Sequence, residues 1–558
     1  MQLRVVCFWH PATNNSGMLR ITQQDSSKAA KSYYTAADYY REGQELVGEW
    51  RGFAAGLLGL EGTVDRLAFD RLCDNLDPRN GERLTARTRS ERTVGYDFTW
   101  SVPKSVSLLY GMTGDPEILA AFRSAVDETM HDMEAEIKTR VRKGGRNEER
   151  TTGNLVWAEF IHTTSRPVDG VPDPQLHAHC FVFNSTWDEE EHRWKAGQFR
   201  GLKADAPYFQ AAFRVRFANK LQELGFAVER KRDDFELAGI GPSTLRRFSR
   251  RTEEIERVAE EKGITDPKRK AELGAATREG KTHELIWDLR KEWDSRLTES
   301  ERKALAEVHR RDKKHARPAK GEGLAVDHAI AHSFTRESVV SERKLLTEAM
   351  KRGLGTVTVE GVRQELSRRP LIRGEQDGRA IATINELKQA EAAIIAFARE
   401  GRGKLRPVGD VKRPISRTYF NEEQKAAVRH VLGSRDRVTI IRGAAGTGKT
   451  TLEDELRLAL AEASVPAAAI AQSTGAVDEL REKAGFGNAA TIAGFLRDEK
   501  LQTAIRGGVL LVDEASLVGT RDMVRLFDIV REEDARVVLV GDRRQHRSVS
   551  AGEPLKLL

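Results

Sequence analysis

The sequence predicts two successive structural parts: an α+β domain, in which an antiparallel sheet is combined with helices, and a parallel α/β lobe of the P-loop type. Strand-like runs that carry an aspartate and three histidines between residues 95 and 183 predict the first part. Three apolar runs with polar or glycine-rich ends, between residues 437 and 545, predict the second. A chain of 558 residues is long enough for several domains.

Two pairs of adjacent tyrosines lie near the start of the chain and hold half of its 8 tyrosines. The four residues are Tyr33, Tyr34, Tyr39 and Tyr40. Ala30, Tyr33, Ala37 and Tyr40 follow helical spacing, so one interpretation is an aromatic helix face that packs on a core. The other interpretation is a set of reactive phenols.

An alternating run of apolar and polar residues occupies positions 95–107. As a strand, this run places Asp97, Thr99 and Ser101 on one face. The pattern therefore offers a carboxylate to any pocket on that side of the sheet.

Three histidines have the arrangement of metal ligands. His177 and His179 alternate in the run 175–183, which is apolar on both faces and predicts a central strand that presents both imidazoles on one side. His162 follows the apolar run 154–160, a second predicted strand that can deliver a third imidazole. Three neutral imidazoles leave positions open on a divalent ion for substrate oxygens. For the His-x-His pair alone, two structural histidines in a core strand are an equal alternative.

Taken together, these features resemble the MobF (TrwC/TraI-type) conjugative relaxases, which are HUH endonucleases that nick and carry a plasmid strand. The shared features are paired tyrosines, an aspartate strand that runs into Ser-x-Pro-Lys-Ser-Val-Ser, and a split histidine triad with Asp-Pro-Gln-Leu-His-x-His. Segments 248–255 and 276–281 extend the resemblance to about residue 300. A rolling-circle replication initiator uses the same chemistry, but the tyrosine pairs precede the histidines here, which argues against it. A DNA-binding ATPase with an inert relaxase half is a third hypothesis.

The resemblance implies transesterification at one DNA phosphodiester. Tyr33 is expected to attack the phosphorus and to form a 5′-phosphotyrosyl link, and Tyr39 to perform a second transesterification that ends transfer. Tyr34 and Tyr40 are further candidates. Asp97 is expected to orient a triad histidine or to accept the tyrosine proton.

The resemblance also implies the ligands and partners. A divalent ion on His162, His177 and His179 is expected to be magnesium or manganese, with zinc as an alternative. The expected partners are single-stranded plasmid DNA at the transfer origin, accessory relaxosome proteins and a coupling ATPase. The resemblance places the protein in the bacterial cytoplasm, with export to the recipient cell while covalently bound to DNA.

The second part contains a full P-loop pattern. The strand-like run 437–442 leads into Gly443, Gly446, Gly448, Lys449 and Thr450, a segment suited to cradle ATP phosphates and to ligate magnesium. Two further apolar runs follow. The first ends in Asp513 and Glu514, suited to hold magnesium and to activate water, and the second leads to Gln545, placed to sense the γ-phosphate.

Neighbouring segments resemble superfamily I helicases. Gln424 matches their adenine-reading Q motif, and residues 472–477 resemble a motif that contacts single-stranded DNA. The order of motifs matches the RecD-like motor of MobF proteins. The chain ends at Leu558, soon after the third motif, so we expect an incomplete lobe that binds ATP but unwinds duplex DNA poorly.

Composition is compatible with a nucleic-acid partner, since the net charge is +7 and 32% of residues are charged. The three cysteines are isolated and fit a reducing compartment, and no apolar run is long enough to insert into a membrane. The predicted organisation is an extension without a role in the activity at 1–17, a relaxase domain at 18–300, a linker and helicase amino-terminal region at 301–415, and a P-loop lobe at 416–558. Because the family's tyrosine lies close to the amino terminus, we expect the working start to be Met18.

Overall fold

The computed structural model divides the chain into two compact units, which are described separately. One unit comprises Met1–Asp327 and Leu346–Ser367, and the other His328–Leu345 and Arg368–Leu558. The structure describes residues 19–33, 47–86, 92–266, 269–270, 273, 285–310, 321–443, 448–542 and 551–558. The proposed start at Met18 lies outside these residues.

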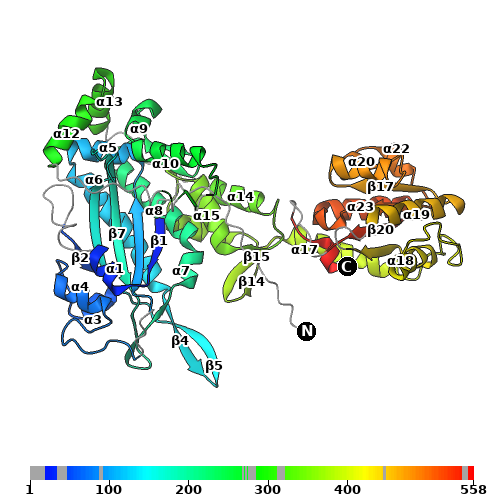
Figure 1. Cartoon of the computed structure of the whole chain (residues 1–558), viewed down its shortest axis with the longest axis horizontal. Helices are drawn as coiled ribbons and strands as arrows, with labels where there is room; N and C mark the ends of the chain where they lie inside the picture. The colour runs from blue at the N-terminus through cyan, green and yellow to red at the C-terminus, as the bar shows by residue number, and fades with distance from the viewer. Residues whose placement is uncertain are drawn as a thin grey trace. The chain divides into compact units, whose positions relative to one another are not determined.

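The first unit is built on a five-stranded antiparallel sheet in the order β1-β3-β7-β6-β2 (Figure 1). Its strands are β1 (Leu19–Gln24), β3 (Gly95–Ser101), β7 (Pro174–Phe183), β6 (Trp157–Thr164) and β2 (Glu49–Arg51). The two-sided apolar pattern of β7 correctly predicts its central position. The α+β class of this unit is therefore confirmed.

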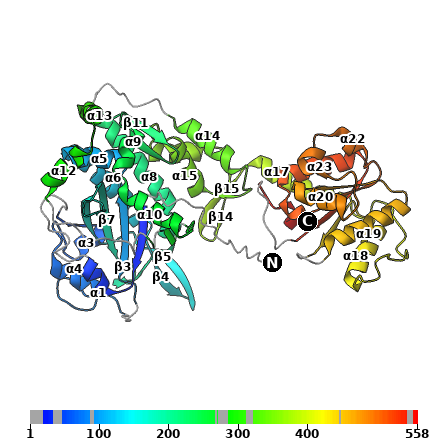
Figure 2. The ribbon, with the colours of Figure 1, turned by 45° about the horizontal axis from the view of Figure 1, so that its top comes forward.

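Helices cover both faces of this sheet. They are α1 (Ser27–Tyr33), α3 (Phe53–Leu57), α4 (Arg66–Cys73), α5 (Lys104–Thr113), α6 (Pro116–Ala135), α7 (Arg200–Ala204), α8 (Ala206–Glu223), α9 (Pro242–Arg247), α10 (Arg250–Glu261), α12 (Ile286–Ser295) and α13 (Glu299–Arg310). Helix α5 packs on β7, and the α8 residue Phe213 packs on Trp100 of β3, which places these helices on one face (Figure 2). Ala30 of α1 and Phe69 of α4 share an apolar cluster with Phe181 on the opposite face.

Short strands complete the first unit, as one three-stranded sheet in the order β10-β4-β5 and two pairs, β8–β9 and β11–β12. They are β4 (Lys138–Lys143), β5 (Arg146–Thr151), β10 (Gly197–Gln198), β8 (Thr186–Asp188), β9 (Arg193–Lys195), β11 (Val228–Lys231) and β12 (Asp234–Leu237). The β4–β5 hairpin extends beyond the central sheet in both views (Figure 1, Figure 2).

Residues 346–367 belong to the first unit although they follow a segment of the second. They contain most of α15 (Glu342–Arg352) and of α16 (Val359–Arg368). The side chains of Asn219 and Gln222 on α8 donate to the carbonyls of Val357 (3.0 Å) and Gly355 (3.1 Å). Arg363 Nε donates to Tyr208 Oη at 2.8 Å, so this late segment is fastened to α8 along its length.

Two element boundaries differ from the sequence predictions. Strand β6 begins at Trp157 and not at Asn154, because the Asn154 side chain bonds to the backbone of Thr152 and Trp187 and thereby ends the extended run. The strand continues to Thr164, so His162 lies inside it. Residues 301–310, which we predicted as part of a linker, continue α13, and Glu301 accepts hydrogen bonds from Thr244 (2.8 Å) and the backbone of Thr298 (2.9 Å).

The second unit contains a five-stranded parallel sheet in the order β16-β20-β19-β17-β18, which confirms the parallel α/β prediction. Its strands are β16 (Val438–Arg442), β20 (Arg536–Gly541), β19 (Val509–Val512), β17 (Ala467–Ala471) and β18 (Ala490–Thr491). Its helices are α17 (Asn385–Glu400), α18 (Glu422–Gly433), α19 (Lys449–Glu462), α20 (Thr474–Glu482), α21 (Ile492–Phe495), α22 (Glu499–Thr503), α23 (Thr520–Glu532) and α24 (Pro554–Leu557), with a 3₁₀ turn η1 (Ala515–Leu517). Two apolar clusters cover the two faces of the sheet.

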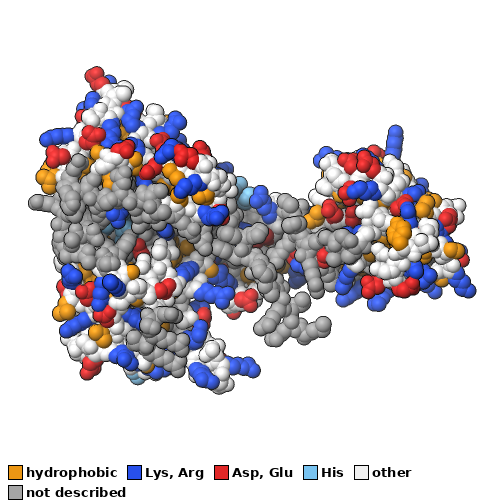
Figure 3. All heavy atoms as spheres, in the orientation of Figure 1, with side chains coloured by type: hydrophobic (Ala, Val, Ile, Leu, Met, Phe, Trp, Pro, Cys, Tyr) orange, Lys and Arg blue, Asp and Glu red, His pale blue; other side chains and the backbone are white. Residues whose placement is uncertain are grey.

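A smaller antiparallel sheet precedes the parallel one. It consists of β13 (Val340–Ser341), β15 (Arg379–Thr383) and β14 (Ile372–Gln376), and α14 (Glu322–Ser333) comes before it. On the face shown in Figure 3, acidic and basic side chains are interspersed over each unit. Within the described ranges, no helix is both long and apolar enough to cross a membrane.

Candidate metal centre and nucleotide-binding loop

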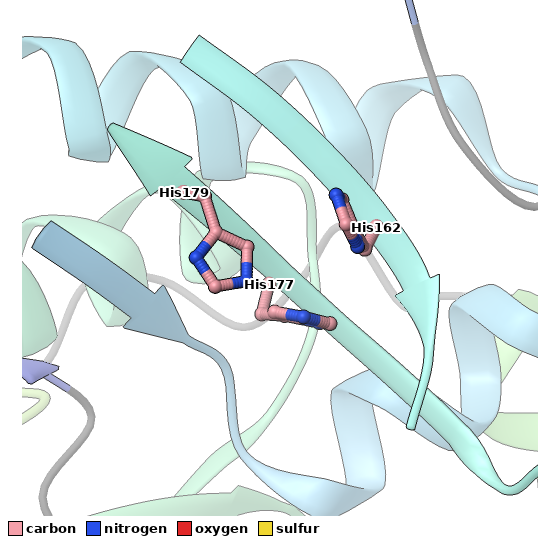
Figure 4. Close-up of side chains that lie close together, drawn as sticks. All are labelled: His162, His177 and His179. Carbon is pink, nitrogen blue, oxygen red and sulfur yellow. The ribbon is translucent and has the colours of Figure 1, made fainter. Parts of the chain in front are cut away.

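The three histidines meet on one face of the central sheet. His162 on β6 lies directly opposite His177 on β7, and His179 lies two residues further along β7 (Figure 4). The ring centroids are separated by 5.1 Å (His162 to His177), 5.1 Å (His162 to His179) and 5.2 Å (His177 to His179). One nitrogen from each ring lies within 4.8 Å of the other two, so the three side chains can share one ion.

The hydrogen bonds of two rings determine which nitrogen faces the common space. His177 Nδ1 lies 2.9 Å from the carbonyl oxygen of Gln175, and His179 Nδ1 lies 2.8 Å from Oδ2 of Asp97. A carbonyl and a carboxylate can only accept, so each Nδ1 carries the proton. Nε2 of both rings therefore keeps its lone pair for a metal ion. This donor set fits a divalent cation that accepts imidazole ligands.

Asp97 reaches the metal centre from β3, as the strand pattern predicts. Thr99 pairs with His179 across the β3–β7 register, and Asp97 is two residues away on the same face. Asp97 is 4% exposed, and its two carboxylate oxygens lie 3.0 and 2.8 Å from His179 Nδ1. The geometry favours the orienting role of Asp97 over that of a proton acceptor, because both oxygens face the ring.

Tyr33, the first predicted tyrosine, is the last residue of a helix that packs on the sheet face with the three histidines. Helix α1 terminates at Tyr33, and its residue Ala30 is buried in the cluster that contains Phe160 and Phe181. Phe160 pairs with His179 in the β6–β7 register, so α1 packs on the face that carries the imidazoles. Tyr34, Tyr39 and Tyr40 lie outside the described residues.

The predicted phosphate-binding loop lies between β16 and α19 in the sequence of the second unit. Lys449 begins α19, and its Nζ donates to the carbonyl of Gly443 at 3.3 Å. Gly448 has φ of 76°, a conformation that favours glycine, and a Cβ there would lie 3.0 Å from Gln424 Nε2. Thr450 follows Lys449 in the first turn of α19, and Gly446 lies outside the described residues.

Two predicted acids follow the end of β19. Asp513 comes directly after the strand, and its Oδ1 accepts from the backbone N–H of Glu514 at 2.7 Å. Burial raises the pKa of Asp513, an effect that the nearby Lys449 opposes. Burial, and next the charge of Asp513, raise the pKa of Glu514. Both carboxylates thus occupy an environment in which a bound cation is favoured.

Gln424 lies beside the loop but also has a structural role. Its Oε1 accepts from the backbone N–H of Asn421 at 3.0 Å, while Asn421 Oδ1 accepts from the backbone N–H of Gln424 at 2.8 Å. This capping box starts α18 and fixes Gln424 next to Gly448. Gln545, the predicted γ-phosphate sensor, lies outside the described residues.

One residue near the loop was missed at the level of sequence. Glu453 is 0% exposed and lies one turn after Lys449 on α19. Burial, followed by the charge of Asp513, raises the pKa of Glu453 to about 9. The available signal was an acid four residues after the P-loop lysine, on the helix face that the lysine shares.

Comparisons with known proteins match two segments of the chain to family models. Residues 27–300 match the family model of the TrwC relaxase, and residues 419–558 match that of an AAA domain. The solved structure of the conjugative relaxase TrwC in complex with oriT DNA, in its metal-bound form, is 31% identical. That match covers 53% of this chain and 100% of the solved chain, with a TM-score of 0.45.

Two groups of curated proteins match different lengths of the chain. The multifunctional conjugation protein TraI of Escherichia coli (strain K12) is 28% identical over 458 residues, which are 77% of this chain and 25% of the relative. The RecBCD enzyme subunit RecD of Mycobacterium tuberculosis (strain ATCC 25618 / H37Rv) is 32% identical over 183 residues, 27% of this chain and 31% of the relative. The chain thus spans about a quarter of the length of TraI.

Proposed function

The chain belongs to the TrwC relaxase family through residues 27–300, and on that premise we propose that it is a conjugative relaxase that cuts one DNA strand at a plasmid transfer origin. One observation carries this proposal. Three imidazoles converge on the sheet face against which α1 packs, and α1 ends at the candidate nucleophile Tyr33.

The proposed reaction is a transesterification. The Tyr33 phenolate attacks the scissile phosphorus, a new P–O bond to the tyrosine forms, and the P–O3′ bond breaks. The products are a 5′-phosphotyrosyl link and a 3′ oxyanion, which takes up a proton to become a free 3′-hydroxyl. A free phenol has a pKa of about 10, so the site must favour loss of the proton from Tyr33. The free energy of the phosphodiester is retained in the covalent link, and rejoining needs no ATP.

His162, His177 and His179 are the proposed metal ligands. A divalent ion bound there supplies Lewis-acid stabilisation of charge on the phosphate oxygens. Asp97 holds the His179 ring through Nδ1, which would leave Nε2 available to ligate an ion. Magnesium or manganese suits phosphoryl chemistry, and zinc is compatible with the same three imidazoles.

The remaining tyrosines complete the proposed cycle. Tyr39 attacks a second phosphodiester and ends transfer, and Tyr34 and Tyr40 are alternative nucleophiles within each pair. Two phenols of separate pairs allow a cleavage and a joining step on one protein. The proposal is supported by the family match, which includes this segment.

For the second unit we propose ATP binding coupled to helicase function. Lys449 and Gly443 bind phosphates, while Thr450 and Asp513 hold magnesium. Glu514 activates water, Gln424 contacts the adenine, and Gly446, Gly448 and Gln545 complete the phosphate site. The AAA-domain match over residues 419–558 and the similarity to RecD support this assignment.

The proposed biological setting follows from the function. The substrate is single-stranded DNA at the transfer origin, and accessory relaxosome proteins and a coupling ATPase are the proposed partners. The protein acts in the bacterial cytoplasm and enters the recipient cell covalently bound to DNA. The similarity to TraI, a conjugation protein, and to TrwC in complex with oriT DNA supports the role in conjugation and the DNA substrate.

A cleavage assay tests the proposal directly. Purified protein is mixed with labelled single-stranded oligonucleotides that cover the cognate transfer origin, with manganese or with EDTA, and analysed on a denaturing gel. We expect a slower protein band that carries the label on the 3′ fragment and that requires the metal. No adduct on any origin oligonucleotide, together with normal ATP binding, would instead support an ATPase with an inert relaxase half.

A further inference from the structure

The start of strand β7, just before the two histidines, is held from the side by helix α5. Ser107 Oγ accepts from the backbone N–H of Leu176 at 3.1 Å, and Lys104 Nζ donates to the carbonyl of Pro174 at 3.0 Å. These two anchor points lie on either side of Gln175. Both α5 side chains therefore fix the peptide groups that determine the direction of the Gln175 carbonyl.

That carbonyl is the hydrogen-bond partner of a candidate metal ligand. Gln175 O lies 2.9 Å from Nδ1 of His177 and thereby selects the tautomer with a free Nε2. A rotation of the Gln175 peptide would turn the carbonyl away from the ring. The orientation of His177 thus depends on the anchors at Pro174 and Leu176.

The two anchors differ in burial. Ser107 is 1% exposed and Leu176 is fully buried, while Lys104 is half-buried. Burial lowers the pKa of Lys104, while Asp173 opposes this effect. Trp293 Nε1 donates to the carbonyl of Pro172 at 2.9 Å, so the same segment is also held from α12.

We propose that Ser107 and Lys104 are positioning residues of the metal centre, which act on His177 through the peptide of Gln175. This inference rests on the proposed metal-dependent function. It gives a chemical role to two residues of Ser-x-Pro-Lys-Ser-Val-Ser that bind the backbone of β7. A hydroxyl and an amine are needed at these positions because one backbone donor and one backbone acceptor must be satisfied in the interior.

Ser105 provides a matched control on the same helix. It is 0% exposed, and its Oγ accepts from the backbone N–H of Leu237 at 2.8 Å. Ser105→Ala and Ser107→Ala therefore delete the same atom and the same kind of hydrogen bond, at two positions that are similarly buried. The difference is the strand that each serine holds: β12 for Ser105 and β7 for Ser107.

The experiment is a calorimetric titration of the full chain with manganese. We expect Ser107→Ala to weaken manganese binding by about tenfold or more, the range found for residues that orient metal ligands. We expect Ser105→Ala to bind within about twofold of the wild type, although both variants lose similar thermal stability. Cobalt absorption spectra provide a second readout and should change in Ser107→Ala alone. If Ser107→Ala does not fold, Lys104→Met replaces it, and we expect the same loss of manganese affinity.

The outcomes separate this inference from the proposed function. Equal manganese affinity and equal cobalt spectra in the wild type, Ser107→Ala and Lys104→Met would overturn the positioning role and leave the metal centre intact. Equal losses in Ser107→Ala and Ser105→Ala would also overturn it, because they indicate a general effect of stability. A wild-type chain that binds neither ion overturns the metal centre itself, and the inference with it.

Discussion

Asp97 Oδ2 lies 2.8 Å from Nδ1 of His179, across two neighbouring strands of the central sheet. His179 is 8% exposed, and its direct cross-strand neighbour is Thr99, so the carboxylate approaches the ring diagonally. A buried carboxylate in this position holds the ring and raises the basicity of Nε2. The relationship links the aspartate of strand β3 to a histidine of strand β7.

Asp97→Asn should weaken metal binding by roughly 10- to 100-fold, because an amide has no charge and can present an N–H to Nδ1. Titration calorimetry with manganese measures the change. Asp77→Asn serves as control, since Asp77 is a buried carboxylate that pairs with Arg79 and is not among the triad's neighbours. An unchanged affinity in Asp97→Asn would show that the carboxylate does not act on the metal centre.

Tyr33→Phe should abolish the covalent protein–DNA adduct and leave binding of single-stranded DNA largely intact, because only the nucleophilic oxygen is lost. Denaturing gels report the adduct, and fluorescence anisotropy of a labelled oligonucleotide reports binding. Tyr419→Phe, which removes the hydroxyl of an exposed tyrosine in the second unit, is the control and should leave the adduct unchanged. A full yield of adduct from Tyr33→Phe would assign the nucleophile to another tyrosine.

Either His177→Ala or His179→Ala should reduce cleavage by orders of magnitude and weaken metal binding, because each change removes one of three ligands. Circular dichroism should show a folded chain. His131→Ala removes an exposed imidazole from α6 of the same unit and should leave both properties unchanged. If neither triad variant altered metal affinity, the histidines would be structural.

Lys449→Ala should weaken ATP binding strongly while origin cleavage stays at the wild-type level, because the P-loop and the histidine triad lie in separate units. Fluorescent ATP analogues measure the first property and the oligonucleotide assay the second. Lys483→Ala, at an exposed position of the second unit, is the control. Loss of cleavage in Lys449→Ala would contradict the independence of the two activities.

Glu159 should make the first unit less stable as the pH rises. Burial raises the pKa of Glu159 from 4.5 to about 7, so the folded chain retains a proton that the unfolded chain has released. The contribution of Glu159 to stability is therefore fully present below pH 4.5, and about 3 kcal/mol of it is lost as the pH rises from 4.5 through 7. Glu159→Gln should remove this dependence and stabilise the unit at pH 8.

Tryptophan fluorescence during urea unfolding at pH 5 and pH 8 measures this effect. All 8 tryptophans precede residue 300, so the signal reports on the first unit. Glu61→Gln, a change at an exposed position, should keep the pH dependence of the wild type. A wild-type unfolding midpoint that is equal at the two pH values would contradict the prediction.

Much of the metal site follows from strand periodicity. The alternation in β7 places His177 and His179 on one face, and the alternation in β3 places Asp97 on a single face as well. Which strands are neighbours does not follow from periodicity. The contact of His162 with His177 required the β6–β7 pairing, and here the family resemblance supplied what the pattern alone could not.

Other features depend on contacts between distant segments. Apolar residues 154–156 resemble the beginning of a strand, but the side-chain bonds of Asn154 to Trp187 start the strand later. Lys104 and Ser107 are conspicuous in sequence, yet their effect on β7 is visible only once α5 lies against it. Glu453 is similar, because its raised pKa arises from its burial beside Asp513.

The interleaved division of the chain determines the order in which the first unit can be completed during synthesis. Domains generally fold as they emerge, amino-terminal first. Here α8 can make its contacts with residues 346–367 only after residues 328–345 of the other unit have been synthesised. Until then the side chains of Asn219, Gln222 and Tyr208 lack the late segment that they bind in the finished protein. A nascent chain halted at Asp327 should therefore be more sensitive to protease than one halted beyond Ser367.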